Sequence, residues 1–283
     1  MGRAVISGIA DLHVHGAPSL VERHGFDHEV LGAHRAAGVD FAVLKAHEGS
    51  TVERAALASQ RELTAGVEVV GGVVLNSPVG GANADAVQVA ARLGGRVVWM
   101  PTVSAPAHIA SAASTELAVH RALAFRQVDV LDPAGRLLPA WQDVLDVVAE
   151  YDLVLASGHL TCAEVLVLFR AAKAAGVRRL LFNHPRMPFL AWDEEASPAL
   201  ADLGVVLELG ILPDILTTDG PPSTTLGEHY PHDLLAFGGD LGHAHYPTLE
   251  QALPGWLGGL EAAVGRPAAE RIMTVNGRQL VQR

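Results

Sequence analysis

The first residues that could do chemistry are two histidines near the amino terminus. In the run Asp11-Leu12-His13-Val14-His15 the apolar residues favour a strand, and residues two apart in a strand face the same way. Two neighbouring imidazoles in an apolar interior lose solvation and repel each other if both are protonated. A shared divalent cation would hold both rings neutral. The spacing therefore indicates a metal site.

Three more residues of this kind close later apolar runs. His159 ends the run 153–159, His184 ends 180–184 and Asp240 ends 235–240. If these runs are parallel strands, all five side chains meet at one mouth. Such a set of nitrogen and oxygen ligands suits zinc first, with manganese, iron, nickel or cobalt as alternatives, and one or two ions per chain. Because Cys162 is the single cysteine, a thiolate cluster and an internal disulfide are both excluded.

Further polar residues end other predicted strands. Lys45 and His47 form a Lys-x-His pair that faces the same mouth. Lys45 would either be a metal ligand, carboxylated and bridging two ions, or stay an ammonium that binds a substrate carboxylate or phosphate. His47, Asn76 and Glu208 are candidates for substrate binding, with structural hydrogen bonds as the alternative. His243 belongs to a loop that lines the pocket or faces solvent.

The elements that must position these groups follow a βα repeat. Apolar runs rich in Val, Ile and Leu alternate with stretches of helical period, which is typical of a parallel sheet. We expect strands at Val5–His15, Val39–His47, Val67–Asn76, Arg96–Pro101, Leu153–His159, Arg179–His184, Val205–Gly210 and Leu234–Asp240. The step from Pro101 to His159 is about twice the others, so an insertion is expected at Ser104–Leu138, with a hairpin at Val128–Leu138.

Helix start signals support this order. Capping-box pairs are expected at Ser50 with Glu53, Thr161 with Glu164, and Thr248 with Gln251. Pro139 and Pro267 suit first helical residues. Eight units in sequence favour an α/β fold of the closed (β/α)8 TIM-barrel type, built as a single domain over residues 1–283. An open doubly wound sheet would instead favour a glycine-rich turn after the first strand, where this chain has His-Gly-Ala-Pro.

Size and charge narrow the function. The 283 residues match one barrel, and 49% hydrophobic against 18% charged residues can fill its core. A net charge of -11 disfavours nucleic acid as a partner, and the apolar runs are shorter than the ~20 residues that cross a bilayer. We expect a cytoplasmic homo-oligomer that acts on a small-molecule substrate.

The pattern resembles the amidohydrolase superfamily, whose signature is His-x-His after strand one, His after strands five and six, and Asp after strand eight. The resemblance implies that His13, His15, His159, His184 and Asp240 bind the metal, and that Asp240 also moves the proton of the attacking water. Val43–His47 and Val98–Thr102 are similar to a bacterial branch of unassigned function. One departure is that Trp99-Met100-Pro101-Thr102 stands where many members have a carboxylated lysine after strand four.

The leading hypothesis is hydrolysis of an amide, lactam, cyclic imide or ester by a metal-activated water, with Asp240 as general acid and base. A metal-dependent decarboxylase or hydratase on the same fold, and a phosphoesterase, are the alternatives. A metal-binding protein without turnover is a rival of another class.

Overall fold

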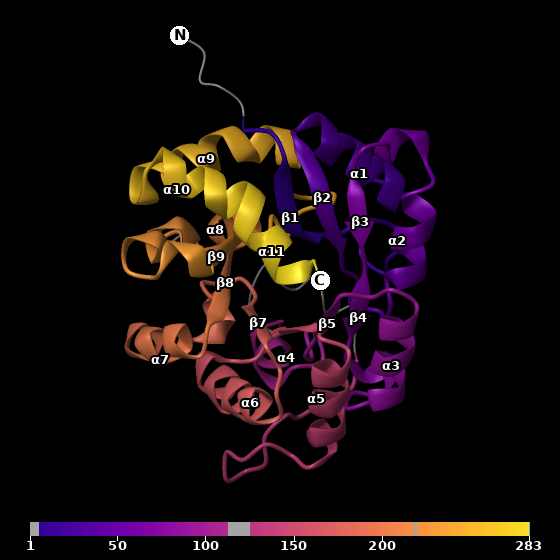
Figure 1. Ribbon diagram of the computed structural model, residues 1–283, viewed down its shortest axis with the longest axis vertical. Helices are drawn as coiled ribbons and strands as arrows, with labels where there is room; N and C mark the ends of the chain where they lie inside the picture. Colours follow the sequence, from indigo (N-terminus) through magenta and orange to yellow (C-terminus); the bar gives the residue numbers. More distant parts are fainter. Residues whose placement is uncertain (1–5, 113–124, 218–219, 283) are drawn as a thin grey trace.

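A computed structural model describes residues 6–112, 125–217 and 220–282 of the chain (Figure 1). Val5, the expected start of the first strand, and residues 113–124 of the expected insertion lie outside the described residues.

The strands appear in the expected order and end near the expected residues. They are β1 (Ile9–Val14), β2 (Val39–Leu44), β3 (Glu68–Val70), β4 (Gly72–Val74), β5 (Val97–Trp99), β6 (Val154–Ala156), β7 (Arg179–Phe182), β8 (Val205–Leu209) and β9 (Leu235–Phe237). The single strand expected at Val67–Asn76 was wrong, because it is divided into β3 and β4. Both backbone polar groups of Gly72 bond to Thr51, at 2.9 and 3.1 Å, and interrupt the ladder there.

The strands form two sheets in which every neighbouring pair is parallel. One has the order β1-β2-β3, the other β4-β5-β6-β7-β8-β9. The segment after β9 also meets β1: Asp240 N–H donates to His13 C=O at 2.9 Å, and Val14 forms a parallel bridge with Leu241. This is the strand order of the expected barrel. Complete closure of the barrel stays a prediction.

Helices flank the strands on either side of the view, and some cross the middle of it (Figure 1). They are α1 (Asp27–Ala36), α2 (Val52–Ala58), α3 (Ala84–Arg92), α4 (Pro106–Ala112), α5 (Ala140–Glu150), α6 (Cys162–Ala174), α7 (Ser197–Asp202), α8 (Ile211–Leu216), α9 (Leu249–Val264), α10 (Arg266–Arg271) and α11 (Gly277–Val281). No helix among the described residues is long and apolar enough to cross a membrane.

Two of the three expected capping boxes are confirmed, at α6 and α9. The third was wrong: α2 begins one residue later than expected, with Thr51 as its N-cap, and Ser50 Oγ donates to Glu53 Oε2 at 2.7 Å instead. Pro139 directly precedes α5, and Pro267 lies in the first turn of α10.

Alternation along the strands divides the core into an inner and an outer layer. In β2, Phe41 and Val43 belong to an inner cluster, whereas Ala42 and Leu44 belong to the cluster that packs against the helices. The inner cluster takes residues from strands of both sheets and from Val281 of α11. Two-residue periodicity therefore builds one apolar interior between the two sheets.

The segment between β5 and α5 was expected to contain a hairpin. Its described part contains α4 and one isolated antiparallel bridge between Leu131 and Leu137, closed by a hydrogen bond from Asp132 N to Arg136 O at 2.8 Å. A bridge of this length is a turn rather than a pair of strands, so the hairpin is not confirmed.

Candidate metal centre

The polar residues singled out by the sequence analysis lie at the carboxyl ends of the strands. His15 and Lys45 directly follow β1 and β2, and Glu208 is the fourth residue of β8. The others follow their strands within three residues: His47 after β2, Asn76 after β4, His159 after β6, His184 after β7 and Asp240 after β9. Parallel strands present these ends on one side of the molecule, so distant parts of the sequence are brought together.

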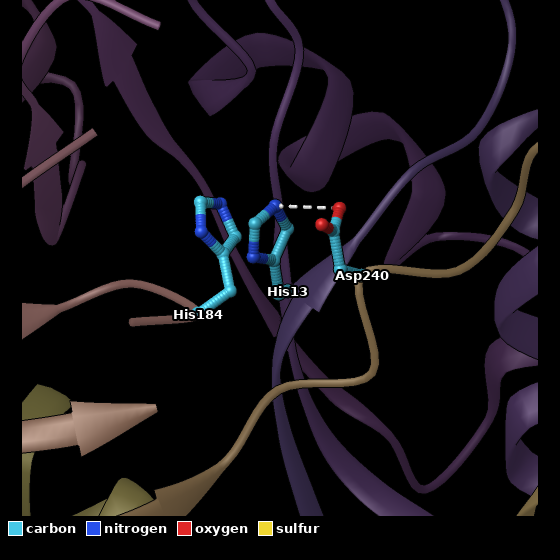
Figure 2. A group of neighbouring side chains, drawn as sticks. All are labelled: His13, His184 and Asp240. Carbon is cyan, nitrogen blue, oxygen red and sulfur yellow. Dashed lines mark ion pairs between the residues drawn. The ribbon is translucent and has the colours of Figure 1, made fainter. Parts of the chain in front are cut away.

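His13, His184 and Asp240 form the most compact group. One ligand atom from each lies within 4.8 Å of the other two, and all three residues are buried. Figure 2 shows His13 between the other two side chains, with its Nε2 atom 3.1 Å from Asp240 Oδ1. Such a cluster has the dimensions of a site that could bind a cation.

His15 joins this group through Asp240. Its Nε2 atom lies 3.1 Å from the same oxygen, Asp240 Oδ1, and its ring centroid is 5.1 Å from that of His13. Its other nitrogen, Nδ1, faces the carbonyl oxygen of Lys45 at 2.9 Å. A carbonyl oxygen only accepts, so the Nδ1 atom of His15 carries the proton and Nε2 presents a lone pair to the carboxylate.

Two lone pairs facing each other at this distance need a positive charge between them. Protonation of His15 could supply it, but burial lowers the pKa of this imidazole well below its usual value. The pKa of His13 also falls, to about 3, again because of burial. A bound divalent cation is the arrangement that satisfies neutral imidazoles and a carboxylate together.

His184 gives independent support. It is completely buried, and neither ring nitrogen has a hydrogen-bond partner among the described residues. Burial lowers its pKa to about 4, so the ring is neutral and offers a lone pair. An unpartnered buried imidazole costs free energy unless it binds something. The residues present therefore fit a divalent metal with nitrogen and oxygen ligands.

The backbone at this group is also unusual. His184 has φ +32° and Asp240 φ +55°, although neither is glycine. Left-handed backbone at such residues costs on the order of 1–3 kcal/mol and concentrates at functional sites. Both residues are thus held in unfavourable backbone conformations that aim their side chains at the cluster.

His159 lies at the edge of the group rather than within it. Its ring centroid is 5.1 Å from that of His184 and 5.8 Å from that of His47, and its Nδ1 atom is 2.9 Å from Nδ1 of His108. His108 ends no predicted strand and was not among the candidate site residues. The structure places it in α4, against His159.

Lys45 is buried in the same centre. Its Nζ atom lies 3.0 Å from His13 Nε2, and burial lowers its pKa to about 8. The neutral amine, which a lowered pKa favours, is the form that reacts with carbon dioxide to give a carbamate. The carboxylated bridge and the free ammonium both stay predictions.

Glu208 and Asn76 have their polar atoms bonded to other protein groups. Glu208 Oε1 contacts His13 Nδ1 at 2.8 Å, and Oε2 accepts from Asn183 Nδ2 at 2.8 Å. Burial raises the pKa of Glu208 to about 7. Substrate binding by Glu208 and Asn76 stays a prediction, and each has a structural bonding role in this structure. Asn183, which directly precedes His184, was missed by the sequence analysis.

A second network surrounds His47. Asn76 Nδ2 donates to His47 O and to Thr102 Oγ1, at 2.8 and 2.7 Å, and Asn76 Oδ1 accepts from the N–H groups of Thr102 and Ser104. His47 Nδ1 lies 2.9 Å from Thr102 Oγ1. Asn76 therefore ties the segments after β2, β4 and β5 together, and it positions His47 at the mouth.

The cluster opens into a narrow cavity. Four of its lining residues are predicted site residues: His15, His47, His159 and Asp240. Four are apolar: Met187, Phe189, Leu212 and Leu216. The other three, Arg23, His243 and Tyr246, come from the loops after β1 and β9. Arg23 was missed because it stands in a polar loop without a recognisable spacing. The expectation that His243 lines the pocket is confirmed.

The fold is similar to that of solved enzymes of the amidohydrolase type. A protein assigned as a 2-pyrone-4,6-dicarboxylic acid hydrolase from Pseudomonas putida is 17% identical, with a TM-score of 0.60 and 97% of each chain covered. An amidohydrolase from Pseudomonas aeruginosa is 11% identical, with a TM-score of 0.62, covering 98% of this chain and 97% of that one. The 2,6-dihydroxybenzoate decarboxylase from Rhizobium is 11% identical, with a TM-score of 0.56 and coverage of 98% and 99%. This chain thus shares the fold of these solved enzymes, as the resemblance to the amidohydrolase superfamily implied.

The sequence itself gives the family. Residues 8–208 match DUF6282, a family of unknown function, and the chain belongs to this family. No curated protein matches the sequence significantly.

Proposed function

We propose that this chain is a metal-dependent hydrolase that cleaves an amide, lactam, cyclic imide or ester bond in a small molecule. The observation that carries the proposal is that two neutral imidazoles lie close to one carboxylate oxygen: Nε2 of His13 and Nε2 of His15 are each 3.1 Å from Asp240 Oδ1. His13, His15, His184 and Asp240 would hold the metal, with Lys45 and His159 beside it. The parallel strands, whose carboxyl ends lie on one side, support this arrangement.

A divalent ion held there would polarise the scissile carbonyl and lower the pKa of the attacking water, so that it loses its proton more readily. Asp240 would take the proton of that water and deliver it to the leaving group. Its carboxylate lines the cavity, and contacts with His13 and His15 keep its pKa well below the usual value although burial alone would raise it. Met187, Phe189 and Leu212 would restrict entry of bulk water.

The test uses the full chain purified with its native metal, then stripped and reloaded with zinc or manganese. Lactones, lactams, hydantoins, dipeptides and phosphoesters form the substrate panel. For any substrate that turns over, Asp240→Asn should retain metal and lower kcat by about 10²- to 10⁴-fold. Turnover that survives complete removal of metal would contradict the proposal, and so would an unaffected Asp240→Asn enzyme.

A decarboxylase or hydratase with one metal is the second candidate. It is favoured if Lys45 is present as a free amine rather than as a carbamate. If this lysine stays uncarboxylated, the described residues offer no bridging carbamate for a second ion. Metal analysis of protein prepared with and without bicarbonate separates the two. Two ions per chain that fall to one in Lys45→Gln support hydrolysis, whereas one ion in both proteins supports the second candidate.

A further inference from the structure

Two loops are paired at the mouth of the cavity. Arg23, in the loop after β1, forms an antiparallel bridge with His243, in the loop after β9. His24 N donates to Gly242 O at 2.9 Å, and Ala244 N donates to Glu22 O at 3.1 Å. Residues directly opposite each other in an antiparallel pair project their side chains to the same side. Arg23 and His243 are therefore held next to each other where both line the cavity.

The pairing depends on a close approach to His15. Gly242 has φ +120°, and a Cβ atom on it would lie 1.8 Å from His15 O. A residue with a side chain does not fit there, so glycine allows the loop after β9 to lie directly on the end of β1. The position of Arg23 and His243 relative to the candidate metal ligands is thus fixed by backbone contacts.

Arg23 presents a donor edge that no described residue occupies. Its Nε and Nη2 atoms are buried, and neither has a hydrogen-bond partner among the described residues. The same edge of Arg54 is filled by a carboxylate: Nε donates to Asp27 Oδ2 at 2.8 Å and Nη2 to Asp27 Oδ1 at 2.7 Å. Buried guanidinium donors without an acceptor are costly, and this edge matches a carboxylate in both spacing and charge.

His243 adds a third donor. Its Nδ1 atom accepts from the N–H of His245 at 3.2 Å, which leaves the proton of the neutral ring on Nε2. Nε2 is buried and has no partner among the described residues. A neutral ring is expected, because burial lowers the pKa of His243 to about 4.

The acidic groups around Arg23 do not occupy its donor edge. Glu48, Asp27 and Asp240 attract it electrostatically and Arg54 repels it. Glu48 uses its Oε1 atom to accept from Ser19 Oγ and Leu20 N, at 2.8 and 2.7 Å. Arg23 forms no ion pair with any residue that the structure describes. The pKa of Arg23, lowered by burial to about 10, leaves it a cation at neutral pH.

We propose that Arg23 and His243 bind a carboxylate group of the substrate at the mouth of the cavity, opposite the bond that is cleaved. This assignment rests on the proposed function for the identity of the cleaved bond, and it specifies the substrate class as a small molecule bearing a carboxylate. One guanidinium edge and one neutral imidazole supply a single positive charge. That suits a planar monoanion better than a phosphate dianion, in a protein whose net charge is already -11.

Binding of succinamate, of the uncharged diamide succinamide and of inorganic phosphate tests the proposal by titration calorimetry. Metal-free and zinc-loaded full-length chains are compared, so the measurement does not depend on turnover. The wild type should bind succinamate about tenfold more tightly than succinamide, because only succinamate offers a carboxylate for a charge-assisted pair with Arg23. Arg23→Gln should remove this preference and leave succinamide affinity unchanged, and Arg23→Lys should keep only part of it.

Arg61→Gln is the matched control, since Arg61 is exposed and its loss changes the net charge equally; the preference should persist there. Thermal unfolding checks that each variant is folded, and Arg23→Lys covers a failure of Arg23→Gln to fold. The proposal is overturned if the wild type shows no preference, if Arg23→Gln retains it, or if phosphate binds more tightly than succinamate. If the protein binds no metal or hydrolyses no substrate but keeps the binding preference, the proposed function is rejected and the carboxylate site is retained.

Discussion

His13 is contacted at both ring nitrogens, and the two contacts have different consequences. Nε2 faces Asp240 and Lys45 in the candidate metal centre, whereas Nδ1 faces Glu208 Oε1 at 2.8 Å. Asn183 fixes the other oxygen of Glu208. A carboxylate behind a metal-binding imidazole selects its tautomer and raises its basicity. Glu208 therefore acts on the centre through His13.

Replacing this carboxylate tests the role. Glu208→Gln should weaken zinc affinity about 10- to 100-fold and leave KM for a discovered substrate nearly unchanged, because the altered group lies behind the imidazole. Competition with a zinc-binding dye measures the affinity, and Glu62→Gln, at an exposed position, is the control. Unchanged zinc affinity together with a raised KM would instead favour the expectation that Glu208 binds substrate.

At the scale of elements, the segment after β6 lies unusually close to the segment after β5. Gly158 has φ +60°, and a Cβ atom there would lie 2.3 Å from Met100 O in the segment after β5. The next residue, His159, donates its N–H to Pro101 O at 2.9 Å. Glycine thus allows two neighbouring strand ends to approach closely, and this approach positions the His159 ring.

Gly158→Ala separates crowding from backbone strain when it is compared with Gly204→Ala. Gly204 has φ +69° and open space where the methyl group of an alanine would lie, so its substitution should cost about 1 kcal/mol of unfolding free energy, from φ alone. Gly158→Ala should cost clearly more, because the methyl group meets a backbone carbonyl. Urea unfolding measures both losses, and equal losses would show that the close approach is relaxed at no cost.

The sequence predicted what repeats in this fold and missed what depends on contacts between distant segments. Periodicity located the strands, and His13, His15 and Asp240 meet because parallel strands end on one side. The break between β3 and β4 was not predictable, since it depends on Thr51 bonding to Gly72 from another unit. Arg23 and His108 lie in segments without periodicity, and only the packed loops reveal what they approach.

At the scale of the whole molecule, burial of neutral imidazoles couples stability to pH. Burial lowers the pKa of His13 to about 3 and of His34 and His184 to about 4. Below pH 6.5 the unfolded chain binds protons at these histidines that the folded chain does not, so stability falls on acidification. Each contributes up to about 1.4 kcal/mol per pH unit between its unfolded and folded pKa.

Two buried carboxyls act in the opposite direction. Burial raises the pKa of Asp11 and of Glu208 to about 7, so between their unfolded pKa and pH 7 the folded chain binds the extra protons. Their contribution to stability is largest at low pH and is lost as the pH rises towards 7. Burial also lowers the pKa of His15, His108 and His243, so six described histidines oppose these two carboxyls and the histidine effect should dominate.

We therefore expect the Tm of the metal-free protein to fall steadily as the pH is lowered from 7 to 5. Thermal unfolding followed by circular dichroism across this range measures it, with the same series in saturating zinc as the comparison. Zinc should raise Tm at pH 7 by binding the folded state, and the increment should shrink towards pH 5 as protons compete for the imidazoles. A Tm independent of pH would mean that these histidines take up protons in the folded protein. Cation binding would then no longer be needed to explain how His13 and His15 face Asp240.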